Sequence, residues 1–441
     1  MRLRSCPAPV ATPAALVALA VVLSLAAACG RPSPAEPHEE GGTARPIEIS
    51  TWWQKAGPSA GELDPLSRLL AIHRKRFPND LVIQAGAGLS ELKRKTLHAR
   101  MLRNDPPDTF EANAGGDLLQ WVLYDRADAS QSRLLPLDDL VEGVADWRRR
   151  VPPAILDQVS QGGKTYGVPV NVYRVNTIFY NKRVFRRFGL DEPKSVADLS
   201  EMERKLRGSG VPLIALGSRE PWTLALLTFE CLLVAREGRA FYVDYFRGRV
   251  AADDMRMQRT LEAALALGPF FNADHQRLSW SEAVDRVADG QAAMTIMGDW
   301  AQAEFNGRGM VQTVDFGEIP FPGSEQSFVF TADTYALPVG AKNQAGARRL
   351  LATMGTREAQ HAMNDGRGAL SARLDVPAPS AMAISLANHD LLERGSLVLA
   401  LSGLVPPPYA ADVAASLSEM LAEHDIEPVL HTLRSRQVLL H

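Results

Sequence analysis

The sequence predicts an α/β fold, in which strands and helices alternate along the chain and pack in layers. Short runs rich in β-branched and aromatic residues alternate with longer segments whose apolar residues recur at helical spacing. The 441 residues are 46% apolar and 22% charged, a globular composition with room for two or three domains. Because strand–helix alternation favours crossover connections, we expect mainly parallel sheets.

Residues 1–28 have the features of a signal peptide. Arg2 and Arg4 precede an uncharged apolar run from Ala14 to Ala28, and small residues lead to Cys29. The run, about 15 residues long, is shorter than the roughly 20 residues that a membrane span needs. The alternative, a membrane anchor, is therefore less favoured.

The small residues before Cys29 resemble the lipobox of bacterial lipoproteins, in which the cysteine is lipidated and becomes the new N-terminus. Ala26 stands where that motif usually has Leu, so cleavage into a soluble secreted form is the alternative. Residues 29–46 are predicted to form the lipidated cysteine and a flexible tether, because they are rich in Pro, Gly and charge. Cys231 lies in an apolar run and is expected to be a buried, inert thiol.

Strands and helices alternate from residue 47 onwards. The predicted strands are Ile47–Trp53, Leu81–Ile83, Thr109–Ala112, Val168–Val172, Thr177–Tyr180, Leu213–Leu216 and Ala292–Met297. The predicted helices are Leu63–Phe77, which Pro78 ends, and Ser90–Met101, Ser195–Gly208 and Trp280–Asp289. Polar and aromatic residues directly follow three of these strands, at Trp52-Trp53, Glu111–Asn113 and Gly298–Trp300. Because α/β sheets bind ligands beyond the carboxyl ends of their strands, these positions predict a binding site.

Two motifs suggest catalysis but lack their structural context. Gly57–Gly61 fits G-x-S-x-G, yet three residues separate it from the preceding strand and Pro58 does not suit the strained turn. Ser90–Lys93 fits S-x-x-K without convincing companion motifs, so we interpret it as part of a solvated basic helix face. No H-E-x-x-H or Walker A motif occurs, and the nine histidines do not cluster. A glycosidase needs only two opposed carboxylates, so a glycoside hydrolase or esterase is kept as the less favoured alternative.

The residues that follow the strands suit a carbohydrate. Sugar rings present apolar faces to an aromatic plane and hydroxyl groups to charged acceptors. The aromatic candidates are Trp52, Trp53, Trp222 and Trp300, and the polar candidates are Glu111, Asn113, Asp117 and Asp299. A single Trp is more often a core residue. Adjacent tryptophans at a strand end point to opposite faces, so one of them can face a cleft.

Segments spread over most of the chain resemble one family. They are Trp52-Trp53, Thr96–Gly116, Gly162–Leu190, Gly210–Trp222, Trp280–Phe305, Phe321–Asn343 and Gly366–Val376. In this order they resemble the extracellular solute-binding proteins (family 1) of bacterial ABC sugar importers, closest to the glucose/mannose-binding branch. The resemblance implies a type II periplasmic-binding-protein fold, with two α/β lobes joined by hinge strands and a ligand cleft between them. It places lobe 1 at 47–170 plus 331–367 and lobe 2 at 171–330 plus 368–441.

The resemblance also implies roles for individual residues. Trp52 and Trp53 would stack on the ligand from lobe 1, and Trp222 and Asp299 would close on it from lobe 2, with Trp300 packing behind. The other implied ligand-binding residues are Glu111, Asn113, Asp117, Asp333, which lies near a hinge crossing, and Arg367. Asn113 and Arg367 depart from the usual family residues, and Glu111 adds a carboxylate where an amide is common. The resemblance therefore leaves the sugar open, with an amino sugar as one alternative.

The implied function is sugar capture without catalysis. The lobes would close on a sugar such as glucose or a relative and deliver it to the permease of an ABC transporter, at the periplasm or cell surface of a bacterium. A sugar sensor for a membrane signalling partner is the alternative. No cofactor, metal or nucleic acid is implied, and a monomer is expected. The formal net charge of −3, from 48 basic and 51 acidic residues, also argues against a strongly basic nucleic-acid-binding protein.

Overall fold

The computed structural model describes residues 45–51, 65–85, 90–123, 132–143, 147–365, 368–378, 388, 390–392 and 396–440. The chain divides into two units, Met1–Thr43 and Ala44–His441. The predicted signal peptide, Cys29 and all but the last two residues of the predicted tether lie outside the described residues. The same is true of Trp52, Trp53, the Gly57–Gly61 motif and Arg367.

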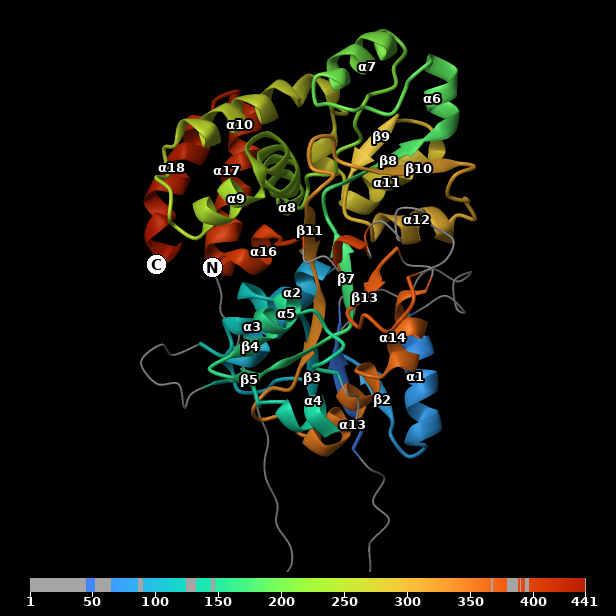
Figure 1. Ribbon diagram of the computed structural model, residues 1–441, viewed down its shortest axis with the longest axis vertical. Coiled ribbons are helices and arrows are strands. Elements are labelled where there is room, and N and C mark those ends of the chain that lie inside the picture. The colour runs from blue at the N-terminus through green and yellow to red at the C-terminus, as the bar shows by residue number, and fades with distance from the viewer. Residues whose placement is uncertain are drawn as a thin grey trace, which may run out of the picture. The chain divides into compact units, whose positions relative to one another are not determined.

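One group of elements surrounds a five-stranded sheet with the order β2–β1–β3–β12–β6 (Figure 1). Its strands are β1 (Ile47–Ser50), β2 (Val82–Gln84), β3 (Thr109–Asn113), β6 (Gly167–Pro169) and β12 (Asp333–Ala336). The helices of this group are α1 (Pro65–Arg76), α2 (Ser90–Leu102), α3 (Gly116–Leu119), α4 (Asp138–Gly143), α5 (Pro153–Leu156), η2 (Asp157–Val159), α13 (Gln344–Met354) and α14 (Arg357–Asn364). A small hairpin of β4 (Ser160–Gln161) and β5 (Lys164–Thr165) follows η2.

The first core lies between this sheet and its helices. Ile47 and Ile49 alternate with half-buried neighbours along β1, as a strand with one packed face requires. Both are fully buried, together with Phe110 of β3 and Leu69 of α1. Burial of this apolar surface is what holds the helices against the sheet.

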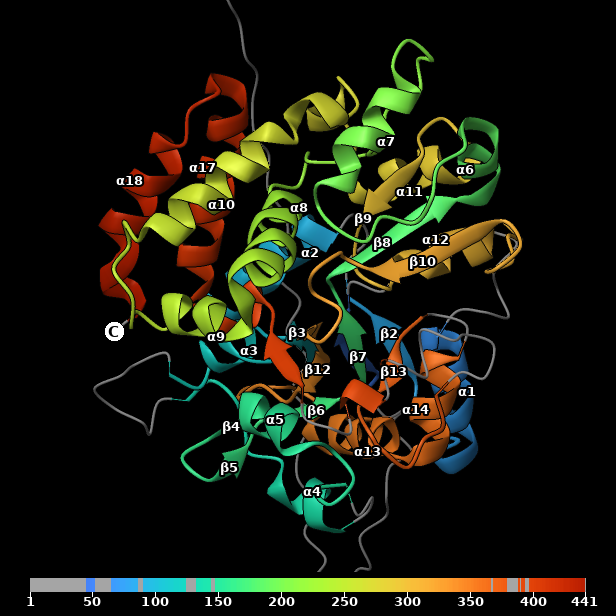
Figure 2. The same ribbon diagram turned by 45° about the horizontal axis from the view of Figure 1, so that its top comes forward.

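A second group of elements surrounds a three-stranded sheet with the order β10–β8–β9 (Figure 2). Its strands are β8 (Thr177–Asn181), β9 (Met294–Ile296) and β10 (Phe316–Pro320). The first helices of this group are α6 (Lys182–Phe188), α7 (Asp198–Leu206), α8 (Trp222–Ala225), the π-helix η3 (Leu226–Leu233), α9 (Val234–Phe246) and α10 (Met255–Ala266). The remaining helices are η4 (Gly268–Phe270), η5 (His275–Arg277), α11 (Trp280–Asp289), α12 (Ala301–Gly307), α16 (Leu401–Leu404), α17 (Pro407–Glu423), α18 (Glu427–Arg436) and η6 (Gln437–Leu440). Cys231 is fully buried in the core of this group, which confirms its predicted burial.

A four-stranded sheet with the order β13–β7–β11–β14 connects the two groups. Its strands are β7 (Asn171–Arg174), β11 (Phe328–Thr331), β13 (Leu370–Ser371) and β14 (Leu397–Leu399). The chain passes from β6 to β7 through Val170 and from β11 to β12 through Ala332, and both residues are fully buried. The Val170 N–H donates to the Asp333 carbonyl at 2.9 Å, and the Ala114 N–H donates to the Ala332 carbonyl at 2.9 Å. The two passages are therefore fixed to the first sheet.

The expectation of mainly parallel sheets is wrong. Parallel pairs join β1 to β2, β1 to β3 and β11 to β14. The other named pairs are antiparallel, including β3 with β12, β12 with β6, and β8 with both β9 and β10. The reason in the first sheet is that β12, the end of a connecting strand, enters between β3 and β6 against the direction of both, which no local pattern reports.

Two predicted strands also need correction. Val168–Val172 is not one strand, because its two halves belong to different sheets on either side of Val170. In Leu213–Leu216 only Ile214 makes ladder bridges, to Phe271 and Met294. The amide of Leu216 instead donates to the side chain of Asn272 at 2.8 Å, which ends the pairing.

The predicted helix Trp280–Asp289 is confirmed at both ends as α11. Ser279 and Glu282 form a reciprocal capping box at its start, and Gly290 ends it with a left-handed φ of 75°. The helix predicted at Ser195–Gly208 is shorter, at Asp198–Leu206, because the Asp198 carboxylate accepts the amides of Lys194 and Ser195 in a turn before it. Among the described residues, no helix combines the length and the apolar character needed to cross a membrane.

Candidate ligand-binding site

Glu111 lies at the centre of a buried polar cluster near the carboxyl end of the first sheet. The Thr51 hydroxyl donates to Glu111 Oε2, and the Tyr335 hydroxyl lies 3.0 Å from the same Thr51 oxygen. Lys93 Nζ donates to the Thr51 carbonyl at 3.1 Å. Burial lowers the pKa of Lys93, and the nearby Glu111 carboxylate partly opposes this shift. β1, α2, β3 and β12 thus converge on one residue, Thr51, which directly precedes Trp52 in the sequence.

Asn113 and Asp117 lie together at the end of β3. The Asn113 N–H donates to Asp117 Oδ2 at 3.0 Å. Arg94 of α2 forms an ion pair with the same oxygen at 3.3 Å, with its side chain 38% exposed. The Asp117 carboxylate therefore fixes the turn after β3 and has a basic partner.

Asp333 binds the connecting strand. Its carboxylate accepts the side-chain amide of Asn171 at 2.8 Å, and its own N–H donates to Asn171 Oδ1 at 2.9 Å. In the first sheet Asp333 pairs in register with Asn113. This side chain therefore joins β12 to β7 at the passage between the groups.

Asp299 lies in the second group of elements and is 1% exposed. The Arg174 N–H donates to Asp299 Oδ2 at 2.9 Å, and the Asp299 N–H donates back to the Arg174 carbonyl at 2.9 Å. Within the described part of the chain, Asp299 Oδ1 has no hydrogen-bond partner. Burial raises the pKa of Asp299 well above its usual range, and nearby Glu318 adds to the shift. A buried acceptor of this kind is costly unless something completes its bonding.

Aromatic side chains surround Asp299. The Trp300 ring meets Tyr173 edge-on, with centroids 5.6 Å apart, and lies 6.1 Å from the ring of Trp222. A Cβ atom at Gly298 would lie 2.1 Å from the Trp300 ring, so only glycine fits before Asp299. Trp222 is 38% exposed, so a large apolar ring is open next to Trp300, the residue that follows Asp299.

The strand β7 runs between the two groups of elements (Figure 1). Asn171 at its start binds Asp333, and Arg174 at its end binds Asp299. At about 3.3 Å per residue, the two carboxyl groups are attached to positions roughly 10 Å apart along the strand. The guanidinium of Arg174 is itself buried, and it donates to Asn388 and to the carbonyls of Ser324 and Ser327. Desolvation lowers the pKa of Arg174 to about 10.

The structure thus places the predicted residues in two sets. Glu111, Asn113, Asp117 and Asp333 lie on β3, α3 and β12, whereas Trp222, Asp299 and Trp300 lie together in the second group. The roles predicted for these residues stay predictions, as do those of Trp52, Trp53 and Arg367, which lie outside the described residues. Trp300 is partly buried and packs against the second core.

Sequence reasoning missed Lys93, Tyr173, Arg174 and Tyr335. The interpretation of Lys93 as part of a solvated face is wrong, because it is 9% exposed. A signal was present, since Lys93 lies one and two helical turns before the buried Leu97 and Met101. No comparable signal marked Arg174, because a buried guanidinium cannot be told from an exposed one by residue type.

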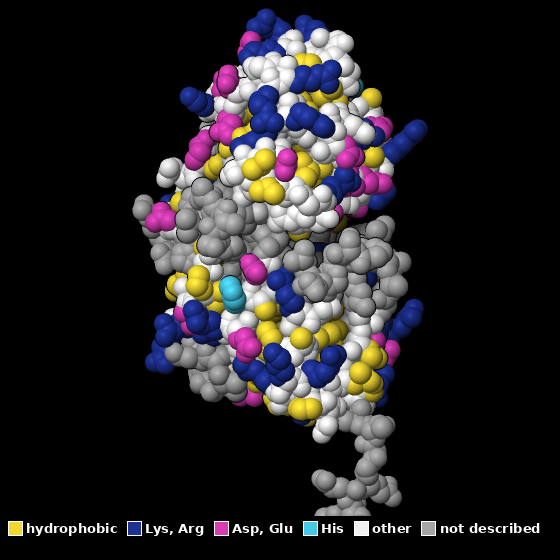
Figure 3. All heavy atoms as spheres, turned by 90° about the vertical axis from the view of Figure 1, so that its right-hand side faces the viewer, with side chains coloured by type: hydrophobic (Ala, Val, Ile, Leu, Met, Phe, Trp, Pro, Cys, Tyr) yellow, Lys and Arg dark blue, Asp and Glu magenta, His cyan; other side chains and the backbone are white. Residues whose placement is uncertain are grey.

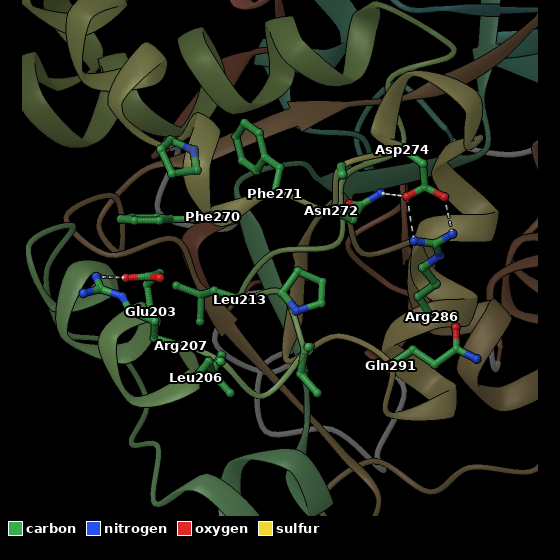
Figure 4. A pocket seen from close by; sticks show the side chains of 16 residues that line it. Glu203, Leu206, Arg207, Leu213, Phe270, Phe271, Asn272, Asp274, Arg286 and Gln291 are labelled. Atoms are coloured by element: carbon green, nitrogen blue, oxygen red, sulfur yellow. Dashed lines mark hydrogen bonds and ion pairs between the residues drawn. The ribbon is translucent and has the colours of Figure 1, made fainter.

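A separate pocket of about 570 Å³ lies in the second group (Figure 4). Phe270 and Leu213 line one side, and Asp274, Arg286 and Gln291 line the other. Trp222, Asp299 and Trp300 are not among the residues that line this pocket. Arg286 is paired with Asp274, and Arg207 with Glu203, so the charges of the pocket are already neutralised.

The described residues contain no group of three or more His, Cys, Asp or Glu side chains placed to hold a metal ion. Lys, Arg, Asp and Glu side chains are intermixed on the face shown in Figure 3, which carries no broad surface of one sign. The candidate site is thus one of aromatic rings and carboxylates within the described part of the chain.

A mixed five-stranded sheet and an antiparallel three-stranded sheet are joined by connecting strands that carry polar and aromatic residues. This arrangement defines the periplasmic-binding-protein class of fold. Residues 86–361 match the family model described as bacterial extracellular solute-binding protein, and the chain belongs to this family. It is accordingly an extracellular binding protein and not an enzyme.

Relatives cover most of the chain. An ABC transporter extracellular-binding protein of Pyrococcus horikoshii is 31% identical over 423 residues, which cover 93% of this chain and 92% of that protein. A probable sugar-binding periplasmic protein of Rhizobium meliloti is 27% identical over 334 residues, covering 75% of this chain and 77% of that one. The solved structure of the bacterial solute receptor AcbH, which prefers β-D-galactopyranose, aligns with a TM-score of 0.74. It covers 89% of this chain and 97% of that chain at 19% identity, and it bears on the fold alone.

Proposed function

We propose that this protein captures a sugar and delivers it to an ABC transporter. The observation that carries the proposal is an exposed Trp222 ring 6.1 Å from the Trp300 ring, together with Asp299, the buried residue before Trp300, whose Oδ1 has no partner within the described residues. An aromatic plane beside a fixed acceptor suits the apolar face and the hydroxyl groups of a sugar ring. The relatives from Pyrococcus horikoshii and Rhizobium meliloti, an ABC transporter extracellular-binding protein and a probable sugar-binding periplasmic protein, support the same class of ligand.

Capture would proceed by closure of two lobes, 47–170 plus 331–367 and 171–330 plus 368–441. A ligand that touches both sets of residues only in the closed form shifts the population toward that form. The buried passages at Val170 and Ala332 are suitable hinge positions, because each separates strands of two different sheets. We further propose that Cys29 is lipidated and that residues 29–46 tether the protein to the outer side of a bacterial membrane.

The charges around the site favour a neutral sugar over an amino sugar. Glu111 accepts the Thr51 hydroxyl and lies near Lys93, and Asp117 is paired with Arg94. We propose a monosaccharide such as D-glucose or a relative, in keeping with the resemblance to the glucose/mannose-binding branch.

The test is a thermal unfolding series of the purified chain from residue 45 onwards with D-glucose, D-mannose, D-galactose, D-xylose and D-glucosamine. A ligand at 100 times its Kd stabilises the folded state by about 2.7 kcal/mol. We expect Tm to rise by several degrees with at least one neutral sugar and by less with D-glucosamine. Unchanged Tm with every monosaccharide, and with maltose and cellobiose, would contradict sugar capture. A rise in Tm with D-glucosamine alone would contradict the proposal of a neutral ligand but not the proposal of sugar capture.

A further inference from the structure

Three glycines form an unusually close backbone contact between the two groups of elements. A Cβ atom at Gly115 would lie 2.3 Å from the Gly403 carbonyl oxygen, and one at Gly116 would lie 2.4 Å from the Val405 carbonyl oxygen. From the other side, a Cβ atom at Gly403 would lie 2.5 Å from the Ala114 carbonyl oxygen. Cβ atoms do not approach backbone this closely, so each position admits only glycine without movement of one chain against the other.

The contact joins elements of different cores. Ala114 and Leu118 pack in the first core, whereas Leu401 and Val405 pack in the second. Leu404 packs against both. The glycines therefore lie where the first and second groups meet, and not inside either of them.

The same contact is attached on both sides to one connecting strand. The Ala114 N–H donates to the Ala332 carbonyl at 2.9 Å, at the passage from β11 to β12. The Ala400 N–H donates to the Phe330 carbonyl at 2.7 Å, and the Gly403 N–H donates to the Ala400 carbonyl at 3.0 Å. The carbonyls of Phe330 in β11 and of Ala332 directly after it thus bind the segments on the two sides of the glycine contact. Because atoms next to a hinge move least when it bends, the contact can persist while more distant atoms travel.

The contact also lies among the predicted ligand-binding residues. Asn113 and Asp117 flank the glycine pair, and the Asn113 N–H donates to Asp117 Oδ2 across the turn. We infer that Gly116 and Gly403 are positioning residues for ligand capture: their lack of side chains lets α3 and α16 meet at the hinge, and this contact allows the cleft to close. The inference rests on the proposed function, since it concerns closure around a ligand.

The test adds a single methyl group on either side of the contact. Gly116→Ala and Gly403→Ala suit this purpose because neither glycine has a positive φ, so alanine meets crowding and no backbone strain. We expect the Kd for D-glucose, or for the sugar that most raises the wild-type Tm, to increase at least tenfold in isothermal titration. We also expect the ligand-free radius of gyration in small-angle X-ray scattering to exceed that of the wild type, because the methyl group holds the two sides apart.

Two other glycines provide matched controls. A Cβ atom at Gly346 would lie 2.7 Å from the Ile47 side chain, inside the first group, and one at Gly307 would meet nothing within 4 Å. Gly346→Ala is expected to lower Tm with Kd changed less than threefold, and Gly307→Ala to change neither. An increase of Kd below tenfold in the two test variants, or an equal increase in Gly346→Ala, overturns the inference.

The outcomes separate this inference from the proposed function. If the wild type binds no sugar, the proposed function fails, and an unchanged ligand-free radius of gyration in both variants then overturns the inference on its own. If neither variant folds, hydrogen exchange of the wild type decides. A persistent contact predicts that protection of the Ala400 and Gly403 amides changes less than threefold on saturation with the sugar, and a larger change contradicts it.

Discussion

The two sets of site residues use their carboxylates differently. In the first, Glu111 accepts the Thr51 hydroxyl and lies near Lys93, and Asp117 is paired with Arg94. In the second, Asp299 receives one amide of Arg174 and retains an oxygen without a partner in the described chain. The first set is polar and internally bonded, whereas the second combines an acceptor with the exposed Trp222 ring. We therefore expect the second set to contribute most of the binding free energy and the first to fix the geometry.

The largest effect is expected at Asp299. Asp299→Ala removes an acceptor whose hydrogen bonds to a ligand contribute about 3 kcal/mol, so the Kd for the sugar should increase about 100-fold. Asp299→Asn keeps an oxygen for the Arg174 N–H and should cost about tenfold. Isothermal titration of both variants measures the difference. Equal sugar affinity of the wild type and Asp299→Ala would contradict the expectation that the second set contributes most of the binding free energy.

The first set is tested through Lys93. Lys93→Met leaves the buried Glu111 without its nearby cation and should destabilise the protein by about 3 kcal/mol in urea unfolding. Adding Glu111→Gln should recover most of the lost free energy of unfolding, since glutamine is uncharged and still accepts the Thr51 hydroxyl. The folded double variant should bind the sugar within threefold of the wild type. A loss of affinity as large as that of Asp299→Ala would instead make Glu111 a direct ligand contact.

Glu230 is a buried carboxylate of the second core that belongs to neither set of site residues. It accepts the Leu401 N–H at 2.8 Å, and burial raises its pKa to about 7. Because the folded state holds this proton up to about pH 7 and the unfolded state releases it near 4.5, stability falls as pH rises through that interval.

The variant that tests this is Glu230→Gln, which cannot ionise. It should lose less stability as pH rises, and above pH 7 it should be more stable than the wild type by roughly 3 kcal/mol at most. Urea unfolding from pH 4 to 8 measures it, and sugar affinity should not change. If affinity also falls, a buried carboxylate outside both sets of site residues contributes to binding.

The smallest free-energy change among these variants is expected for Trp222→Ala. Trp222→Ala removes a ring that is 38% exposed, so the ligand-free Tm should shift little, while the Kd should rise about tenfold from lost stacking. Met255→Ala is the control, since Met255 is 67% exposed and lies in α10. A wild-type Kd in Trp222→Ala would leave Asp299 as the dominant contact of the second set.

Local patterns predicted several elements well. The helix predicted at Trp280–Asp289 matches α11 at both ends, and the strand predicted from Ile47 begins where β1 begins. Glu111, Asn113 and Asp299 are candidate binding residues because they lie at or directly after the ends of predicted strands. Local patterns failed for Val168–Val172, because the break at Val170 depends on partners far away in the sequence, such as Asp333.

The sequence by itself determined the family, the α/β class and the positions where polar and aromatic residues follow strands, because these depend on residue type and spacing. Only the tertiary structure decided strand direction, the burial of Lys93 and Arg174, and which carboxylates are already bonded. It alone also revealed the backbone contact of Gly115, Gly116 and Gly403. The physical reason is that hydrogen bonding and desolvation depend on which segments, far apart in the sequence, come into contact in the folded chain. Local residue patterns do not indicate these contacts.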